Sequence, residues 1–141
     1  MKHTRVSLRV HCIFGTKERQ PSIPDDLQVR LWAFIGGIVR RLGMKAIAVG
    51  GVADHVHILL LLPPTMPLAE AIQKIKANSS RWLHEQTGKQ FQWQEGYAAF
   101  SVSISHTDAT VAYILNQRKH HERRSFDQEM TAILRKHRMD E

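Results

Sequence analysis

Hydrophobic and polar residues alternate at the start of the chain. Val6, Leu8, Val10, Cys12 and Phe14 are apolar, and they alternate with the polar or charged residues Arg5, Ser7, Arg9 and His11. A period of two is typical of a strand with one buried face. The pattern therefore predicts a first strand over Thr4–Phe14, with Cys12 on its apolar face and His11 on its polar face.

Two longer segments carry apolar residues at helical spacing. In the first, apolar positions recur every three or four residues up to about Gly43, and the Ser22–Asp25 stretch before them has the cap, proline and acidic residue of a helix start. In the second, the same spacing begins at Leu68 and stops at Gly88. We therefore predict two amphipathic helices, each with one packed face and one solvated face.

The remaining segments complete the predicted fold. Met44–Gly50 and His55–Leu62 are short β-type runs joined by a connection of hairpin length, so we expect them to pair antiparallel. Tyr97–Ser105 alternates again, and the chain from Asp108 onward has a helical pattern with a break at Ser125. This order predicts an α+β fold of the ferredoxin-like or RRM-like kind. Two helices would cover one face of a four-stranded antiparallel sheet and leave the other face open.

Size and charge narrow the functional classes. The chain has 141 residues, the length of one ordinary domain, so we predict a single domain over residues 1–141. It has 20 Lys and Arg against 13 Asp and Glu, which gives a net charge of +7. A charge of this sign favours an anionic partner, and nucleic acid is the leading candidate.

Membrane insertion and cysteine chemistry are both disfavoured. The apolar run Ile58–Leu62 is far shorter than the roughly 20 residues of a spanning helix, and the first residues lack the apolar stretch of a secretory signal. We expect a cytoplasmic protein with no membrane partner. The one cysteine, Cys12, has no partner for an internal disulfide and is expected to be a buried structural thiol.

A pair of histidines in a predicted strand is the first candidate site. In His55-Val56-His57, residues i and i+2 project from the same face of the strand, which places the two imidazoles close enough to share one metal ion. Two polar residues on the exposed face of a half-buried strand would have the same pattern. The pair alone therefore leaves both interpretations open.

The predicted last helix presents a polar face that includes a tyrosine. Spacings of four, three and four place on this face Tyr113, Gln117, His120 and Arg124. The packing stripe of the same helix is expected to comprise Val111, Ala112, Ile114 and Leu115. Tyr113 is either an amphipathic residue at the helix edge or a nucleophile that attacks phosphorus. In the second case, Gln117 would supply a carbonyl oxygen to a metal or position the phosphate.

Basic residues directly follow the tyrosine and glutamine. Residues 118–124 are basic or imidazole at all but one position, which indicates either a solvated surface or a phosphate clamp. Trp93 and Tyr97 offer possible stacking surfaces for bases. Taken with the basic positions elsewhere, we expect DNA contacts from Lys17, Arg19, Lys74, Arg81, Arg118 and Lys119.

Together these motifs resemble a known family. The motifs that carry the resemblance are His11–Arg19, Asp54-His55-Val56-His57, Trp93–Tyr97 before a strand that ends at Ser101, and Tyr113 followed by Asn116-Gln117 and His120-His121. They are similar to those of the single-tyrosine HUH transposases of the smallest bacterial insertion sequences, a group related to the REP-associated tyrosine transposases. The resemblance spans roughly His11–Glu129, which is nearly the whole domain.

The resemblance implies a chemistry and a role for each matching residue. His55 and His57 match the metal ligands of the family, Gln117 the third ligand, and Tyr113, on the C-terminal helix, the nucleophile. Such an enzyme cleaves single-stranded DNA at an element end through a 5′-phosphotyrosine and rejoins it to another strand. A phenol is a weak nucleophile at neutral pH, so a cation that withdraws charge from the phosphate suits this chemistry.

The resemblance also implies a cofactor and partners. It indicates Mg²⁺ or Mn²⁺, whereas two imidazoles alone would suit Zn²⁺ or Ni²⁺ equally well. It further implies DNA hairpins at the element ends as substrate. We expect a homodimer in which the tyrosine helix of one subunit completes the histidine pair of the other.

Two rival functions fit part of the sequence. A non-catalytic module that binds single-stranded nucleic acid, such as an inactive or domesticated copy, would bind DNA whether or not Tyr113 or a metal is present. A metal-dependent nuclease that uses water would cleave DNA without forming a covalent adduct. Covalent attachment of DNA to protein therefore separates the transposase from both.

Overall fold

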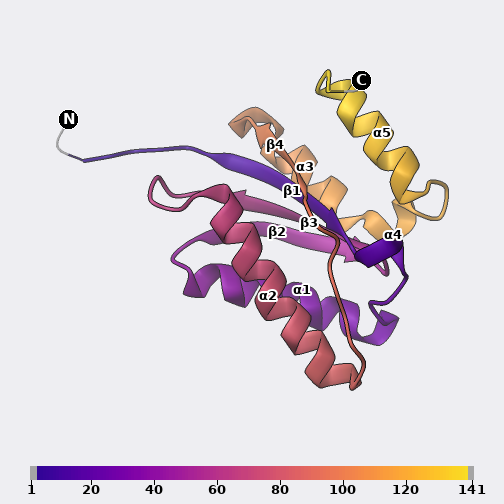
Figure 1. The fold of residues 1–141 in the computed structure, drawn as a ribbon. Helices are drawn as coiled ribbons and strands as arrows, with labels where there is room; N and C mark the ends of the chain where they lie inside the picture. The colour runs from indigo at the N-terminus through magenta and orange to yellow at the C-terminus, as the bar shows by residue number, and fades with distance from the viewer. Residues whose placement is uncertain (1–2, 140–141) are drawn as a thin grey trace.

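The computed structural model describes residues 3–139, so residues 1–2 and 140–141 of the predicted domain lie outside the described residues. The elements follow one another along the chain as shown in Figure 1. They are β1 (Arg9–Gly15), η1 (Lys17–Arg19), α1 (Asp25–Arg41), β2 (Lys45–Val52), β3 (His55–Leu61), α2 (Leu68–Thr87), β4 (Ala98–Val102), η2 (Ile104–His106), α3 (Thr107–Leu115), α4 (Gln117–His120) and α5 (Phe126–Lys136).

The strands form one sheet in the order β2-β3-β1-β4, and every neighbouring pair is antiparallel. This is the predicted α+β sheet, and the predicted pairing of β2 with β3 is confirmed. The first strand is shorter than predicted because it begins at Arg9, which already pairs with Leu61 and Val102 near the ends of the neighbouring strands. Val6 and Leu8 lie before β1 and are exposed. Alternation in the sequence therefore continues beyond the first residue of the strand, although the backbone oxygen of Leu8 still accepts a hydrogen bond from Leu62.

Helices α1 and α2 lie on one face of the sheet (Figure 1). Their apolar stripes pack on the inward residues of the strands, which include Cys12 and Phe14 of β1 and Val56, Ile58 and Leu60 of β3. Apolar residues at helical spacing bury one stripe against a sheet and leave the opposite face in water. Both predicted amphipathic helices are confirmed.

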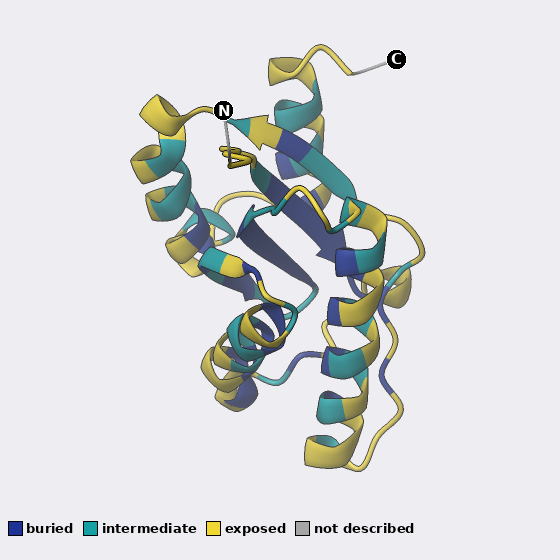
Figure 2. Cartoon of the chain, turned by 90° about the vertical axis from the view of Figure 1, so that its left-hand side faces the viewer, coloured by how far each residue is buried: buried dark blue, intermediate teal, exposed yellow. Residues whose placement is uncertain are grey.

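The opposite face of the sheet is covered, which corrects the expectation of an open face. Helices α3 and α5 lie over it (Figure 1), and the central strands are deeply buried between the two helical layers (Figure 2). Ile13 packs there with Phe100 and Phe126, and Leu59 packs with Ile114. All but the last residue of β3 are buried, as expected of a strand covered on both sides.

The predicted C-terminal helix is divided into three. The break at Ser125 is confirmed, because Ser125 caps α5 and its side chain accepts a hydrogen bond from the backbone N–H of Gln128. A second break at Asn116 separates α3 from α4. Ala112 and Leu115, both predicted in the packing stripe, are exposed, whereas Ile114 of the same stripe is buried.

Cys12 has no accessible surface, as predicted for a structural thiol. Burial raises the pKa of this thiol to about 12, which keeps it in the unreactive protonated form. No helix within residues 3–139 is long and apolar enough to cross a membrane.

Candidate active site

Strand β3 places the predicted histidine pair beneath α3 and α5. His55 and His57 are fully buried, and their ring centroids lie 5.1 Å apart. Both project toward the face opposite Val56, because successive residues of a strand point to opposite sides. The prediction that the two imidazoles share a face is confirmed, and the alternative of an exposed pair is wrong.

The tyrosine helix brings two more predicted residues to the same place. The ring of Tyr113 packs edge-on against His57, with centroids 5.6 Å apart. The Oε1 atom of Gln117 lies 3.2 Å from the Nε2 atom of His55, and the Gln117 side-chain amide donates to the backbone oxygen of Tyr113 at 3.2 Å. The four residues predicted for metal binding and nucleophilic attack therefore converge within one chain.

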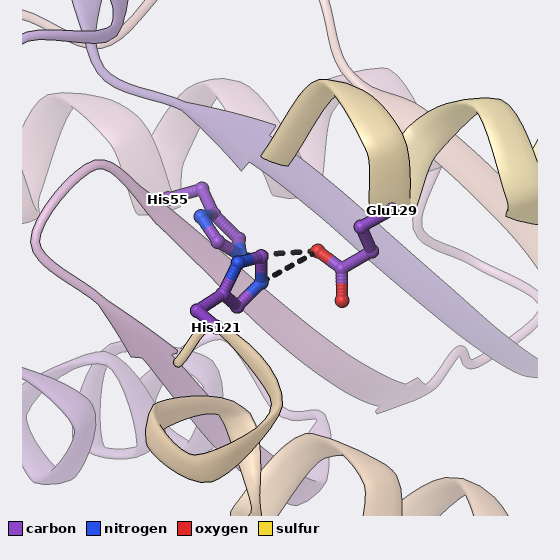
Figure 3. Close-up of side chains that lie close together, drawn as sticks. All are labelled: His55, His121 and Glu129. Atoms are coloured by element: carbon purple, nitrogen blue, oxygen red, sulfur yellow. Dashed lines mark hydrogen bonds and ion pairs between the residues drawn. The ribbon is translucent and has the colours of Figure 1, made fainter. Parts of the chain in front are cut away.

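A buried glutamate that the sequence analysis did not identify lies at the centre of this cluster. Glu129 of α5 has no exposed surface, and its Oε1 atom lies 3.2 Å from Nε2 of His55, 3.2 Å from Nε2 of His57 and 3.1 Å from Nε2 of His121. Figure 3 shows His55 and His121 pointing toward this carboxylate from β3 and from the segment after α4. Its second oxygen, Oε2, accepts a hydrogen bond from the Tyr113 hydroxyl.

A signal for Glu129 is present in the sequence. The apolar stripe that anchors α5 includes Phe126, Met130 and Ile133, and Glu129 lies at helical spacing within this stripe. A carboxylate on a packed face has to meet hydrogen-bond donors or a cation, because an unpaired buried charge is costly. His121, considered in the sequence only as part of the basic run after the tyrosine and of the family resemblance, is one of the imidazoles that meet this carboxylate, with its Nε2 atom 3.1 Å from Oε1 of Glu129.

Hydrogen bonds at the outer nitrogens orient the imidazoles. His55 donates from Nδ1 to the Asp54 carboxylate at 2.8 Å, and His121 donates from Nδ1 to the backbone oxygen of Arg124 at 2.6 Å. Both Nε2 atoms therefore point into the cluster, the arrangement typical of histidines that bind metals. His57 shares a 2.8 Å hydrogen bond between its Nδ1 and Nε2 of His11, a residue with no predicted role.

Ligand atoms of His55, His121 and Glu129 all lie within 4.8 Å of one another. Gln117 Oε1 lies 3.0 Å from Nε2 of His121 as well as close to His55. Inward imidazole nitrogens and oxygens so close together suit a shared cation. The donor set therefore fits a divalent metal ion.

Burial and hydrogen bonding set the charge states. Burial lowers the pKa of His11 to about 3 and that of His57 to about 4, so both imidazoles are neutral at pH 7. Burial alone would lower the pKa of His55, but hydrogen bonds with Asp54 and Glu129 outweigh it and raise that pKa. A neutral imidazole is the form that binds a metal. The lowered pKa of His57 therefore favours its metal-binding form, whereas the raised pKa of His55 means that a metal has to compete with a proton there.

The pKa values of Tyr113 and Glu129, which are joined by a hydrogen bond, are shifted in opposite directions. Burial, reinforced by the neighbouring carboxylate of Glu129, raises the pKa of the Tyr113 phenol. Burial would also raise the pKa of Glu129, but hydrogen bonds from His55 and His57 outweigh it and hold that pKa far below its ordinary value. The phenol is therefore protonated beside an ionised carboxylate.

Comparison with known proteins identifies the family. Residues 4–117 match the profile of the family described as "Transposase IS200 like". The chain belongs to the IS200-like transposases. The resemblance drawn from its motifs is confirmed.

Two curated relatives of this chain share one description with each other. The transposases for insertion sequence element IS200 from Salmonella typhimurium and Salmonella typhi are each 29% identical to it over 92 residues. The match covers 62% of this chain and 58% of each relative. It therefore spans less than two thirds of their length.

Two solved structures resemble the fold of this chain. A candidate transposase from Deinococcus radiodurans R1 superposes with a TM-score of 0.66 and 26% identity, over 80% of this chain and 94% of that chain. A REP-associated tyrosine transposase bound to a REP hairpin superposes with a TM-score of 0.57 and 14% identity, over 81% of this chain and 70% of that chain. At this identity the second likeness concerns the fold alone.

The basic residues predicted to bind DNA lie in separate places on the molecule. Lys119 lines a cavity of about 530 Å³ beside His120, and the lining also includes Arg123 and Arg124. Arg118 is directed elsewhere, because it donates to Gln28 of α1 at 3.0 Å. Of Arg118 and Lys119, which were both predicted to contact DNA, Lys119 therefore lines this cavity and Arg118 does not.

The other predicted DNA contacts are divided between the two sides of the sheet. Arg19 pairs with Asp127 at the start of α5, whereas Lys17 donates to the side chain of Gln92. On α2, an ion pair at 3.1 Å joins Lys74 to Glu70, and a hydrogen bond joins Arg81 to Asn78. Helix α2 belongs to the opposite layer from Tyr113 (Figure 1). The expected DNA contacts of Lys74 and Arg81 therefore lie apart from the site.

Trp93, considered as a stacking surface, is buried and donates from its indole N–H to Ser79 at 2.9 Å. It packs edge-on against Phe14 with centroids 4.8 Å apart, so it belongs to the core. Tyr97 is 38% exposed, and its use as a stacking surface stays a prediction.

Gly50 allows the tyrosine helix to approach the sheet. It pairs with His57 in the register of β2 and β3, and a Cβ atom built on it would lie 2.3 Å from the backbone oxygen of Ile114 in α3. Gly50→Ala should therefore push α3 and Tyr113 away from the histidines. We expect a loss of about 1–3 kcal/mol in the free energy of unfolding, measured with urea. We also expect a fall in covalent DNA attachment of about 100-fold, because reacting groups tolerate little displacement.

Gly37→Ala is the matched control. Gly37 lies within α1, where the only atom near an added Cβ is the flexible end of Arg40 at 3.7 Å. Alanine there should stabilise the protein by about 0.5–1 kcal/mol and leave DNA attachment unchanged. Equal behaviour of the two variants would contradict the role given to Gly50.

Proposed function

We propose that this chain cleaves and rejoins single-stranded DNA at the ends of an insertion element, with Tyr113 as the nucleophile. The observation that carries the proposal is the position of Tyr113, whose ring packs against His57 inside a cluster of buried imidazoles. Membership of the IS200-like transposase family supports transposition as the overall process.

A divalent metal ion belongs to this proposal. His55, His57 and Gln117 would hold it, and His121 and Glu129 offer a further imidazole and a carboxylate beside them. When bound, the ion would withdraw charge from the scissile phosphate and stabilise the leaving oxygen. The oxygens of Gln117 and Glu129 support a hard cation such as Mg²⁺ or Mn²⁺ over an ion bound by imidazoles alone.

Tyr113 exchanges one phosphodiester for another. Its hydroxyl oxygen attacks the phosphorus, the bond between phosphorus and the 3′ oxygen breaks, and the strand with the free 3′-hydroxyl leaves. The other strand stays attached as a 5′-phosphotyrosine. Attack on this intermediate by a different 3′-hydroxyl joins the strands and releases the tyrosine. Because each step conserves a phosphodiester, the reaction needs no ATP.

The proposed substrate is single-stranded DNA with hairpins at the element ends. The net charge of +7 supports an anionic partner, and the REP-associated tyrosine transposase of similar fold was solved bound to a REP hairpin. The homodimer stays a prediction. Within the single chain described, Tyr113 packs against His57, and the exchange of the tyrosine helix between subunits stays a prediction as well.

The proposal is tested by trapping the covalent intermediate. The protein is incubated with Mn²⁺ and labelled single-stranded hairpin DNA that carries the flanks of the element, then separated under denaturing conditions. We expect a protein–DNA adduct that a chelator prevents. Cleavage without an adduct would favour a nuclease that uses water. Binding with neither would favour a non-catalytic module.

A further inference from the structure

The two carboxylate oxygens of Glu129 contact different parts of the candidate site, one the histidines and the other the tyrosine. Oε1 lies 3.2 Å from Nε2 of both His55 and His57, and Oε2 accepts the hydrogen bond of the Tyr113 hydroxyl. The Glu129 side chain is completely buried. One carboxylate therefore links the reacting phenol to the candidate metal ligands.

The phenol needs a proton acceptor before or as it attacks. The ordinary pKa of a phenol is about 10, so a tyrosine hydroxyl keeps its proton at neutral pH. The surrounding imidazoles of His11, His57 and His120 present their rings edge-on to the phenol ring. The hydrogen bond of the hydroxyl runs to Glu129 Oε2.

We propose that Glu129 is a catalytic residue that accepts the proton of Tyr113 during attack on the DNA phosphate. The inference rests on the proposed function and adds a proton acceptor to it. The O–H bond of Tyr113 breaks as its oxygen bonds to phosphorus, and the proton passes to Oε2. The bond to the 3′ oxygen breaks, and that oxygen takes a proton from solvent. During rejoining, Glu129 returns a proton to the departing phenol oxygen, and the incoming 3′-hydroxyl releases its own to solvent.

A weakly basic carboxylate is sufficient for this task. In protein kinases, an aspartate accepts the proton of the attacking hydroxyl during phosphoryl transfer, although a hydroxyl is far less acidic than a carboxylic acid. Such a transfer is coupled to formation of the bond to phosphorus and needs the acceptor within hydrogen-bond reach. Glu129 meets this requirement without any movement of Tyr113.

The position of Glu129 is fixed by the packing of α5. Phe126 is buried against Ile13 and Phe100, and Met130 packs on the same cluster. The ring of Phe126 also stacks on His55, with centroids 4.2 Å apart and planes at 14°. These contacts lie on either side of Glu129 in the helix, so they hold its carboxylate over the histidines.

The test compares Glu129→Gln with the wild-type protein in single-turnover adduct formation. Glutamine has nearly the same shape but cannot take the proton. We expect the rate to fall about 10²–10⁴-fold, the usual contribution of a general base. Glu85→Gln is the matched control, because Glu85 is exposed on α2, in the layer away from Tyr113, and it should keep the wild-type rate. The two rates are compared at saturating Mn²⁺, and the melting temperature of Glu129→Gln, measured by calorimetry, should be nearly unchanged.

A more acidic nucleophile separates a proton acceptor from a structural role. With 3,5-difluorotyrosine at position 113, the phenol loses its proton readily, so Glu129→Gln should regain most of its lost rate. No recovery would overturn the proposal, as would faster adduct formation in Glu129→Gln, which would mark the carboxylate as an obstacle to the phosphate. Recovery by excess Mn²⁺ alone would also overturn it, because Glu129 would then act only as a metal ligand.

Failure of the proposed function gives a different result. If the wild-type protein forms no adduct with DNA that it binds, the tyrosine chemistry is wrong and the role of Glu129 falls with it. If the wild-type protein forms the adduct and Glu129→Gln forms it equally fast, only the role of Glu129 is overturned.

Discussion

Replacing Tyr113 with phenylalanine is expected to abolish the covalent protein–DNA adduct while the variant still binds hairpin DNA. The substitution removes only the hydroxyl, which donates to Glu129, so the ring keeps its packing against His57. Loss of a nucleophile typically costs at least about 10⁴-fold in rate. Loss of one hydrogen bond should change the free energy of unfolding by only about 1 kcal/mol. Denaturing gels and a DNA-binding titration measure the two effects.

Tyr97→Phe is the matched control, because the chain has only 2 tyrosines and Tyr97 is partly exposed at 38%. It should keep the wild-type level of adduct. A Tyr113→Phe variant that still attaches DNA would show that another residue is the nucleophile. Loss of DNA binding in the same variant would indicate a structural role instead.

Replacing His57 with alanine should remove both metal binding and strand cleavage. His57 is fully buried, and its Nε2 lies 3.2 Å from Glu129 at the centre of the cluster. Because loss of even an outer partner of a metal ligand costs about 10–100-fold in affinity or activity, loss of a ligand should cost at least about 100-fold in Mn²⁺ affinity. Adduct formation should fall below detection. Calorimetry and the adduct assay measure the two quantities.

His84→Ala is the control for this prediction. His84 lies on α2, in the layer away from Tyr113, where its Nδ1 donates to the backbone oxygen of Lys89 at 3.0 Å. It should keep both Mn²⁺ affinity and adduct formation. His57→Ala with unchanged Mn²⁺ affinity and a native melting temperature would contradict the placement of the metal.

Local periodicity explains why half of the site was predictable. His55 and His57 are two residues apart in a strand, and this spacing alone places them on one face. Tyr113 and Gln117 are four residues apart, and the Gln117 side chain bonds to the backbone oxygen of Tyr113 although a break at Asn116 divides the helix. These relations depend on neighbours in the sequence, so the pattern reveals them.

The remaining contacts of the site, those of Glu129 and His11, depend on how segments that are distant in the sequence pack together. Glu129 meets His55 only because α5 crosses back over the sheet, and no spacing in the sequence specifies that path. His11 reaches His57 through the pairing of β1 with β3. The prediction of an open sheet face was wrong for the same reason, because it treated the C-terminal helices as an addition to the fold. They form its second layer.

The most direct test of the proposed chemistry is to locate the DNA attachment. The adduct formed with Mn²⁺ is digested with protease and nuclease, and the modified peptide is sequenced by mass spectrometry. The account predicts a nucleotide joined through its 5′-phosphate to Tyr113 and to no other residue. A nucleotide on Tyr97, a histidine or a serine, or a cleaved strand with no modified peptide, would contradict it.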